Sequence, residues 1–405
     1  MEIFRRWNYR LEPVGSQADQ FVRTGRRNRY VWNYFLGYME EAYLAARSAG
    51  GSLAPITYPE MSRILTLLKA EQPDLYEAPA DTLQQTLMDL RETQVRFFKK
   101  LAGRPRFRGY GHARFRFPNP KQVLIEKDWI KFPKMGWLRF RKSRVFEGSV
   151  RSLTVFWEHG HWWVSILTKC QVEIPPSPAG LPVGIDRGVS NSLALSTGQL
   201  LHFPVPTDRE ERFHRFLARS VSRKRKGSVR RTRALGRLNR LRRRVTDRRR
   251  DATHCVINRL VRETPVVVIE DLRLRNMTRS AKGTVAEPGR NVRAKSGLNR
   301  SLLKQAHGEF TQILRYKSVR SGVELIEVPP HYTSQQCSGC GHTAPENRPS
   351  QARFRCVSCG HEAHADVNAA LNILAAGLAV TAQGGTALAA RRTANPLKMT
   401  RRTAA

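Results

Sequence analysis

Four cysteines of the chain form two Cys-x-x-Cys pairs, Cys337 with Cys340 and Cys356 with Cys359. Such pairs supply the four thiolates of a tetrahedral zinc site, and the glycine after each second cysteine suits the tight turn around the metal. Two disulfides, or reduced structural thiols, are the alternative. Because the N-terminal residues do not read as a secretory signal, we expect the thiols to stay reduced. The spacing therefore predicts bound Zn²⁺.

Three acidic residues lie at the ends of expected strands or at the start of an expected helix, positions from which their side chains could meet in the folded protein. Asp186 and Glu270 each end a short apolar run typical of a buried strand, and Asp366 begins an Ala- and Leu-rich stretch typical of a helix. On local evidence alone, Asp366 is more simply interpreted as a helix N-cap. Carboxylates from different elements can hold two Mg²⁺ ions for phosphodiester hydrolysis, one activating the water and the other stabilising the leaving oxygen. Asp271 should face away, because neighbouring strand residues point to opposite faces.

The charge of the chain indicates its partner. Its 405 residues include 71 Lys and Arg against 33 Asp and Glu, a formal net charge of +38, and 40% are apolar. This length and composition predict a globular protein of two or three domains. The charge predicts a polyanion, nucleic acid, on its surface. An anionic membrane is the weaker alternative, because the basic residues are spread along the chain and no apolar run approaches the ~20 residues of a membrane span.

The first half of the sequence predicts strands interrupted by helices. An alternating stretch at 4–11 reads as a strand, and 17–46, 58–69 and 81–101 read as helices. Strand patterns resume after Pro105, so we expect a β-barrel-like domain split by a helical insert.

Basic and aromatic residues alternate directly after this insert. Arg106 and Arg108 flank a phenylalanine, and Arg114 and Arg116 alternate with two more. One face of such a ribbon can bury its rings while the other meets phosphates. Within the insert, Trp32 reads either as a base-stacking group or, more simply, as core.

The second half predicts a sheet accompanied by a basic helix. A hairpin is expected at 183–195 and a buried strand at 266–269. Residues 219–250 contain sixteen Lys and Arg and one Asp along a helical leucine stripe. That density favours a helix that follows phosphates over a merely solvated face. The basic stretch at 279–300 reads as a mobile loop, followed by a helix at 302–319.

Several of these segments resemble the transposon-encoded TnpB (OrfB) family and its descendants, the compact type V CRISPR effectors. The likeness covers most of the chain. One departure is His364 in His-Ala-Asp, where many members carry Asp-Arg-Asp, although Asp366 itself is kept. The segments that carry the likeness are GIDRG at 184–188, VIEDL at 268–272, TSQQCSGCG at 333–341 and DVNAALN at 366–372, with 10–13, 29–33, 105–107 and 131–137 similar to the family's opening and central β motifs.

The resemblance implies an α+β multidomain protein whose nuclease domain is RNase H-like (RuvC), a mixed α/β fold with an inserted four-cysteine zinc ribbon. A split β-barrel (wedge) domain with a helical recognition insert would precede it. The domains expected are the wedge-like β-barrel at 1–14 and 105–175, the recognition insert at 15–104, the RuvC-like domain at 180–330 and 361–380, the zinc-ribbon target-strand module at 331–360, and a disordered basic tail at 381–405.

The resemblance also implies an RNA-guided, Mg²⁺-dependent DNA endonuclease of transposon origin, which cuts double-stranded target DNA beside a short adjacent motif. Base pairing with the guide RNA would carry the sequence, and a basic channel would hold the A-form duplex. Asp186, Glu270 and Asp366 would be catalytic and hold two Mg²⁺ ions. One protein per guide RNA and a cytoplasmic, nucleoid-associated location are expected. The residues expected to contact nucleic acid are Tyr58, Ser62 and Gln84, where relatives read the adjacent motif, and Arg106, Arg108, Arg223, Arg225 and Arg230.

Three other functions stay open on the sequence. A compact type V CRISPR effector would have a CRISPR array beside its gene rather than a transposon end. A guided repressor would bind target DNA without cutting it. A transposase acting through a covalent protein–DNA adduct lacks a candidate, because no serine or cysteine has the local pattern of an activated nucleophile.

Overall fold

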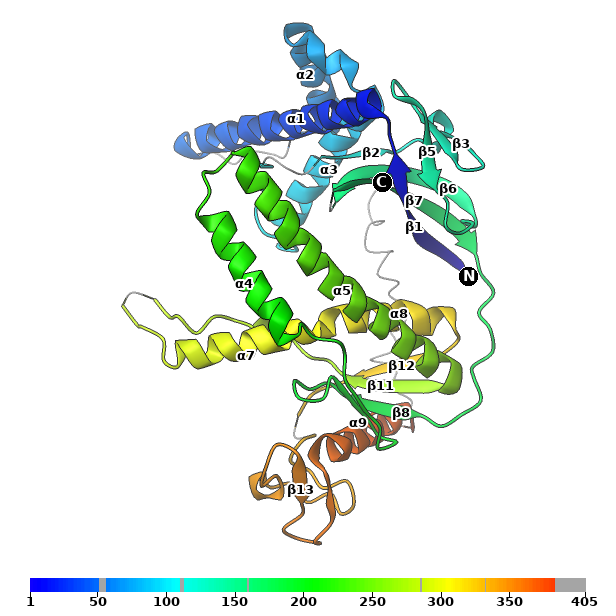
Figure 1. Cartoon of the computed structure of the whole chain (residues 1–405), viewed down its shortest axis with the longest axis vertical. Coiled ribbons are helices and arrows are strands. Elements are labelled where there is room, and N and C mark those ends of the chain that lie inside the picture. Colours follow the sequence, from blue (N-terminus) through cyan, green and yellow to red (C-terminus); the bar gives the residue numbers. More distant parts are fainter. Residues whose placement is uncertain (51–55, 110–112, 159, 285, 332, 383–405) are drawn as a thin grey trace. The chain divides into compact units, whose positions relative to one another are not determined.

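The computed structural model describes residues 1–50, 56–109, 113–158, 160–284, 286–331 and 333–382 (Figure 1). The chain divides into two compact units, Met1–Val172 and Glu173–Ala405. The candidate carboxylates and the four cysteines all belong to the second unit. Apart from its first two residues, the tail predicted at 381–405 lies outside the described residues.

An antiparallel sheet of seven strands forms the first unit together with three helices. Its strands are β1 (Glu2–Glu12), β2 (Arg114–Phe117), β3 (Leu124–Glu126), β4 (Trp129–Phe132), β5 (Gly136–Arg141), β6 (Ser149–Glu158) and β7 (His161–Gln171). The order is β2-β6-β7-β1-β5-β4-β3, so the first strand of the chain lies between strands from the later segment. Phe117 of the edge strand β2 stacks on Phe132 of β4, with ring centroids 5.0 Å apart. The sheet therefore rolls up around a shared core.

Three helices interrupt this sheet in sequence, close to the predicted ranges. They are α1 (Gly15–Ser48), α2 (Tyr58–Glu71) and α3 (Ala80–Phe98), and the short 3₁₀ turns η1 (Pro73–Glu77) and η2 (Pro120–Gln122) lie in the connections. Trp32 and Phe35 of α1 are 6% and 0% exposed and pack against α2 and α3. The indole N–H of Trp32 also donates to the carbonyl oxygen of Arg106. Trp32 is therefore a core residue and not a base-stacking group.

The second unit is built on a mixed sheet of five strands. They are β8 (Val183–Asp186), β9 (Leu193–Leu195), β10 (Leu200–Leu201), β11 (Val266–Glu270) and β12 (Glu324–Val328), in the order β10-β9-β8-β11-β12. β8, β11 and β12 run parallel, and β9 and β10 join through antiparallel pairing, which includes the predicted hairpin. The apolar run of β11 fits a central strand buried on both faces.

The helices of the second unit differ from the sequence prediction in two places. They are α4 (Asp208–Ser222), α5 (Val229–Glu263), α6 (Leu274–Met277), α7 (Val292–Gln305), α8 (His307–Arg320) and α9 (Ala365–Ala382). The basic stretch predicted as one helix is divided between α4 and α5, where Gly227 has a φ of +86°. The basic loop predicted at 279–300 is helical from Val292 onward, and Ala306, in the left-handed region, separates α7 from α8.

Alternation along the central strands decides which helix covers which face of the sheet. Ile185 and Ile269 pack in a core with α5 and α8. Val268, which points to the opposite face, packs with Ile373 of α9. The second unit is therefore a three-layer α/β/α structure, with α9 supplying the apolar contact on its side.

Helix α9 approaches the sheet so closely that two positions require glycine. A Cβ atom on Gly184 of β8 would lie 2.2 Å from the carbonyl oxygen of Ala370, and one on Gly377 of α9 would lie 2.5 Å from the Val268 side chain. By length and composition α9 is apolar enough to span a membrane. Its close contact with the sheet accounts for that composition, because a helix that packs in a protein core buries apolar side chains.

Candidate active site and metal centre

Asp186, Glu270 and Asp366 come from three elements and lie on the same side of the sheet. Asp186 ends β8 and Glu270 ends β11, and because these strands are parallel neighbours, both residues lie at one edge. Side chains alternate between the two faces of a strand, so Asp186 and Glu270 point to the same face as Gly184 and Val268, two residues before them. That face packs against α9, the helix whose second residue is Asp366. Glu270 and Asp366 are each 8% exposed. The three carboxylates singled out from the sequence are therefore gathered in one buried place.

The electrostatics of this cluster reflect its crowding. Burial, followed by the charges of Glu270 and Asp366, raises the pKa of Asp186 from 3.8 to about 7. A hydrogen bond from the backbone of Arg187 and the charge of Arg348 act in the opposite direction. Three carboxylates in a desolvated site cannot all ionise without a counter-charge, so the site favours a bound cation or a retained proton.

Neighbouring side chains hold two of the carboxylates in place. Asp366 accepts a hydrogen bond from Asn191 Nδ2 at 2.9 Å and forms an ion pair with Arg348 at 3.0 Å, one partner on each oxygen. The Thr333 hydroxyl donates to Glu270 Oε1 at 2.7 Å. Each carboxylate oxygen has a second lone pair, so these bonds orient the ligands and still leave acceptor sites for a metal ion.

Arg187, next to Asp186, is a buried arginine that joins the strands to α8. It is 7% exposed, donates to Thr311 Oγ1 at 2.6 Å, and donates to the backbone carbonyl oxygen of Glu270. Burial lowers its pKa, and the negative charges of Glu270, Glu327 and Asp186 oppose that shift. An arginine stays protonated in such a site, so it supplies a permanent positive charge beside the carboxylates.

The donor set fits a hard divalent cation such as Mg²⁺, which prefers carboxylate oxygen atoms. In the described part of the chain, the four cysteines are the group of potential ligands whose donor atoms all lie within 4.8 Å of one another. The three carboxylates do not form so tight a group, which is consistent with their mutual repulsion. The fit for Mg²⁺ rests on the type, burial and convergence of the donors.

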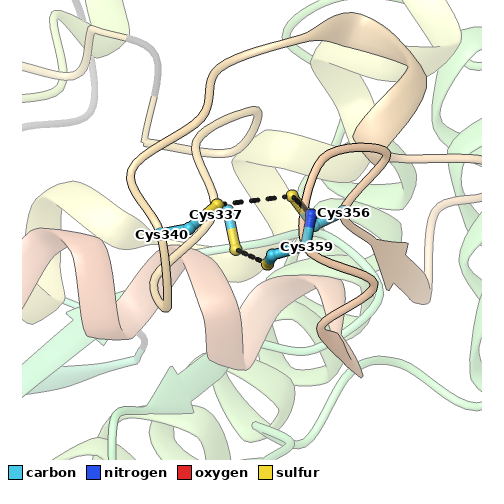
Figure 2. Close-up of side chains that lie close together, drawn as sticks. All are labelled: Cys337, Cys340, Cys356 and Cys359. Atoms are coloured by element: carbon cyan, nitrogen blue, oxygen red, sulfur yellow. Dashed lines mark hydrogen bonds between the residues drawn. The ribbon is translucent and has the colours of Figure 1, made fainter.

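The four cysteine sulfur atoms point toward one another from two loops (Figure 2). Cys337 Sγ lies 3.7 Å from Cys359 Sγ, and Cys340 Sγ lies 3.6 Å from Cys356 Sγ. Thiolates about 2.3 Å from a tetrahedral Zn²⁺ ion are about 3.8 Å apart, so the spacing matches zinc. All four are free thiols, and the disulfide alternative is therefore wrong for this structure.

Two asparagines one turn apart on α9 fasten the loop that carries Cys337 and Cys340 to the helix that carries Asp366. Asn368 and Asn372 donate to the carbonyl oxygen of Gln336 at 2.8 and 2.7 Å. Asn372 also donates to the carbonyl oxygen of Thr333 at 2.9 Å. The four-cysteine module continues through the 3₁₀ turn η3 (Pro345–Asn347) and the hairpin β13 (Arg353–Arg355) and β14 (Glu362–His364). It is thus fixed to the helix that carries Asp366.

The residues of the first unit predicted to contact nucleic acid lie on several elements. Tyr58 and Ser62 are one turn apart on α2, and Gln84 lies on α3; all three are half-buried. Arg106 is exposed. Arg108 stacks its guanidinium 3.5 Å from the centre of the Trp32 ring, so one face of that group is already in use within the protein.

In the second unit, the predicted contacts are exposed arginines around one turn. Arg223 and Arg225 lie between α4 and α5, and Arg230 is in the first turn of α5. These three arginines belong to the second unit, and the other five predicted nucleic-acid residues belong to the first.

Sequence reasoning missed Arg348 and Asn191, the two residues bonded to Asp366. They are 18 and 175 residues from it in the chain, and neither lies in a spacing pattern that predicts a contact. Thr333 lies in the segment 333–341, which carries the family likeness. That likeness was the signal in the sequence that could have indicated a role for Thr333, which donates to Glu270.

Family models match three parts of the chain. OrfB_IS605, described as a probable transposase, matches residues 165–281, and the Cas12f1-like TNB domain matches 307–373. A helix-turn-helix domain of the OrfB type matches residues 1–47. In this structure those residues are one strand followed by a single long helix, not a helix-turn-helix.

Two curated relatives span nearly the whole chain. A protein named putative RNA-guided DNA endonuclease InsQ, from Escherichia coli K12, is 39% identical over 95% of each chain. A putative RNA-guided DNA endonuclease from Streptomyces pristinaespiralis is 33% identical over 95% of this chain and 92% of its own. A solved Cas12f1–sgRNA–target DNA complex has the same fold, with a TM-score of 0.52, 14% identity, and coverage of 88% of this chain and 82% of that one. With these relatives matched from end to end, the chain belongs to the TnpB (OrfB) family.

Proposed function

We propose that this protein is a transposon-associated, RNA-guided DNA endonuclease that hydrolyses target DNA beside a short adjacent motif. The observation that carries the proposal is the gathering of three carboxylates, two of them buried and Asp186 half-buried, on the α9 side of the sheet. The end-to-end likeness to relatives named as RNA-guided DNA endonucleases supports it. The matched part of a CRISPR-associated relative, Cas12f1 of Sulfoacidibacillus thermotolerans, is only 18% of this chain, which favours the transposon-associated reading over a CRISPR effector.

In this proposal Asp186, Glu270 and Asp366 hold two Mg²⁺ ions. Bound there, Mg²⁺ would supply Lewis-acid activation of water and charge stabilisation of the leaving oxygen. The protein's own part is to orient the ligands through Thr333 and Asn191. Because the cluster is desolvated, its carboxylates interact strongly with any cation that enters.

The domain assignment follows the same proposal. We assign 180–330 and 361–380 to an RNase H-like (RuvC) nuclease domain, supported by the mixed sheet between two helical layers with carboxylates at its strand ends. The zinc ribbon at 331–360 would contact the target strand. The split sheet, 1–14 and 105–175, would be the wedge domain, and 15–104 the recognition insert.

The partners in this proposal are a guide RNA and double-stranded target DNA. Arg6 of the first unit supports this, because it lies near Arg114 and Arg116 of β2; burial and then these two charges lower its pKa. Like charges held together favour an anionic partner such as a phosphate backbone. One protein per guide RNA, and a cytoplasmic location at the nucleoid, complete the proposal.

The proposal is tested by purifying the protein from cells that also carry its native flanking DNA. The bound RNA is sequenced, and the complex is then incubated with Mg²⁺ and a duplex that matches the guide segment. We expect one transposon-derived RNA and cleavage of the matched duplex, with a mismatched duplex left intact. Specific RNA and target binding without cleavage would instead identify a guided repressor, and the absence of any specific RNA would refute guided recognition.

A further inference from the structure

Helix α4 carries two phenylalanines that its own packing does not need. Phe213 and Phe216 are 49% and 65% exposed, and their rings stack with centroids 6.3 Å apart and an interplanar angle of 12°. The buried side of α4 is formed by other residues, since Leu217 and Val221 pack against Ala234 and Leu238 of α5. An exposed aromatic pair on a helix with a complete apolar contact indicates a binding surface.

The surface around Phe216 is strongly basic and hollowed. By their three- and four-residue spacing, Arg212, Arg215, Arg219 and Arg223 lie on the same side of α4 as Phe216. They belong to a pocket of about 530 Å³. The residues that line this pocket are Arg212, Arg215, Phe216, Arg219, Ser220, Arg223 and Lys224.

Helix α4 is held rigidly beneath this pocket. Thr207 and Glu210 form a reciprocal capping box at its start. Glu210 is also paired with Arg248 at 2.8 Å, and Glu211 is paired with Lys304. These ion pairs engage the two acids with α5 and α7. The charge of Glu211 also acts on Arg215, and the other arginines of the pocket supply the positive charge that an anion would meet.

We propose that this α4 surface binds an unpaired stretch of nucleic acid, one base stacking on the Phe216–Phe213 pair while the arginines hold the flanking phosphates. An aromatic face that accepts any base, set among cations, is the arrangement of sequence-independent single-strand sites. A protein partner is disfavoured, because it would have to cover four arginines to reach two phenylalanines. This inference rests on the proposed function for its partner, but the site is separate from the carboxylates.

Substitution of the rings tests the stacking directly. The double variant Phe213→Leu/Phe216→Leu keeps apolar side chains but removes the aromatic faces. We expect it to bind a 15-nucleotide single strand about fivefold or more weakly, with no change for the same sequence as a duplex. Because no charge is altered, the slope of binding against salt should not change. Equal weakening for single strand and duplex, or no weakening, would overturn the proposal.

A tryptophan reporter identifies the strand that contributes the base. The variant Phe216→Trp should restore single-strand affinity, and its emission, measured as the difference from the wild-type protein, should be quenched when a base stacks on it. The matched control is Leu181→Trp, at a 79% exposed position. Quenching on addition of guide RNA assigns the base to the guide, and quenching only on addition of target duplex assigns it to the DNA. Equal responses in Phe216→Trp and the control would contradict stacking.

This test is independent of cleavage. Loss of single-strand affinity in the leucine variant would support the α4 site even if the wild-type protein did not cut its target. Conversely, the wild-type protein could perform guided cleavage while neither single-strand binding nor the fluorescence response depends on Phe213 and Phe216. That result would refute the α4 site and leave the proposed function intact.

Discussion

Asp186 shares its buried position with Glu270 and Asp366, so its ionisation decides how readily the cluster accepts a cation. Its raised pKa means that the metal-free protein keeps a proton there near neutral pH. Replacing that proton by a divalent ion relieves the repulsion among the three side chains. The residues bonded to Glu270 and Asp366 then fix the direction of the ligands.

The stability of the metal-free protein should depend on the ionisation of Asp186. Because the folded-state pKa, about 7, is above the ordinary 3.8, the folded protein binds the proton more tightly. This contribution is present at low pH and is lost as the pH rises through about 7. Relative to Asp186→Asn, the wild-type protein should lose roughly 2 kcal/mol between pH 5.5 and pH 8.5 in EDTA. Parallel Tm–pH curves for the two proteins would contradict the shift.

Thr333 should matter through metal binding and not through folding. Thr333→Val keeps the shape of the side chain but removes the hydroxyl that donates to Glu270. Loss of a bond that orients a metal ligand costs about tenfold or more in metal affinity. We therefore expect the Mg²⁺ concentration for half-maximal cleavage to rise about tenfold, while Thr333→Ser retains the wild-type value. A lowered maximal rate at unchanged Mg²⁺ dependence would argue against this role.

The sequence predicted the chemical groups of the site better than their supports. Asp186, Glu270 and the cysteines lie in local patterns, a strand end or a paired spacing, that can be read without the fold. Arg348 and Asn191 lie in no such pattern, because their contact with Asp366 is created by tertiary structure across up to 175 residues. Local sequence does not determine such contacts.

Among the elements, α9 does the most to build the site. It places Asp366 against two strands, fastens the loop of Cys337 and Cys340 through its asparagines, and packs on β8 where Gly184 leaves room for its backbone. The distance between α9 and the sheet therefore also determines the distance between Asp366 and the two carboxylates on the strands.

Gly184→Ala should disturb that spacing. The added methyl group would lie 2.2 Å from a backbone oxygen of α9, so the helix must move away, at a cost of about 1–3 kcal/mol. We expect a lower Tm and weaker Mg²⁺-dependent activity. Gly236→Ala is the matched control: a Cβ at that position of α5 meets no atom within 4 Å, and alanine favours a helix. Equal behaviour of the two variants would show that α9 does not approach β8 as described.

Element prediction failed where the burial pattern gave no information. Residues 292–300, the first part of α7, were interpreted as a loop because, of the 14 residues of this helix, only Gln305 is buried, so no apolar stripe marks it. The predicted single basic helix was divided because the sequence pattern does not reveal that Gly227 adopts a positive φ. Strands such as β1, β8 and β11 were recognised, since their alternation or apolar runs reflect real burial on the sheet faces.

At the scale of the whole molecule, a net charge of +38 leads us to expect that a bound RNA stabilises the folded protein. The basic residues repel one another in the folded chain, and bound phosphates relieve that repulsion. The three arginines Arg6, Arg114 and Arg116 illustrate this, because burial and then the charges of Arg114 and Arg116 lower the pKa of Arg6.

Replacing these three arginines by glutamine should flatten the salt dependence of guide-RNA binding. Removing three phosphate contacts lowers the slope of log K against log salt by about 2 for single strands. A control triple, Arg104, Arg139 and Arg141, consists of arginines already paired with Glu40, Asp128 and Glu12, and should change the slope much less. An unchanged slope in the first triple would show that its arginines do not contact phosphate.

The most direct test of the central claim is guided cleavage by the three carboxylate variants Asp186→Asn, Glu270→Gln and Asp366→Asn, each purified with its guide RNA. Asp128→Asn, an exposed acid paired with Arg139, is the control. If the three side chains hold the catalytic metal ions, each variant binds guide RNA and matched target as the wild-type protein does but loses Mg²⁺-dependent cleavage by at least about a hundredfold. Wild-type cleavage rates in any of the three variants with binding intact would contradict the account.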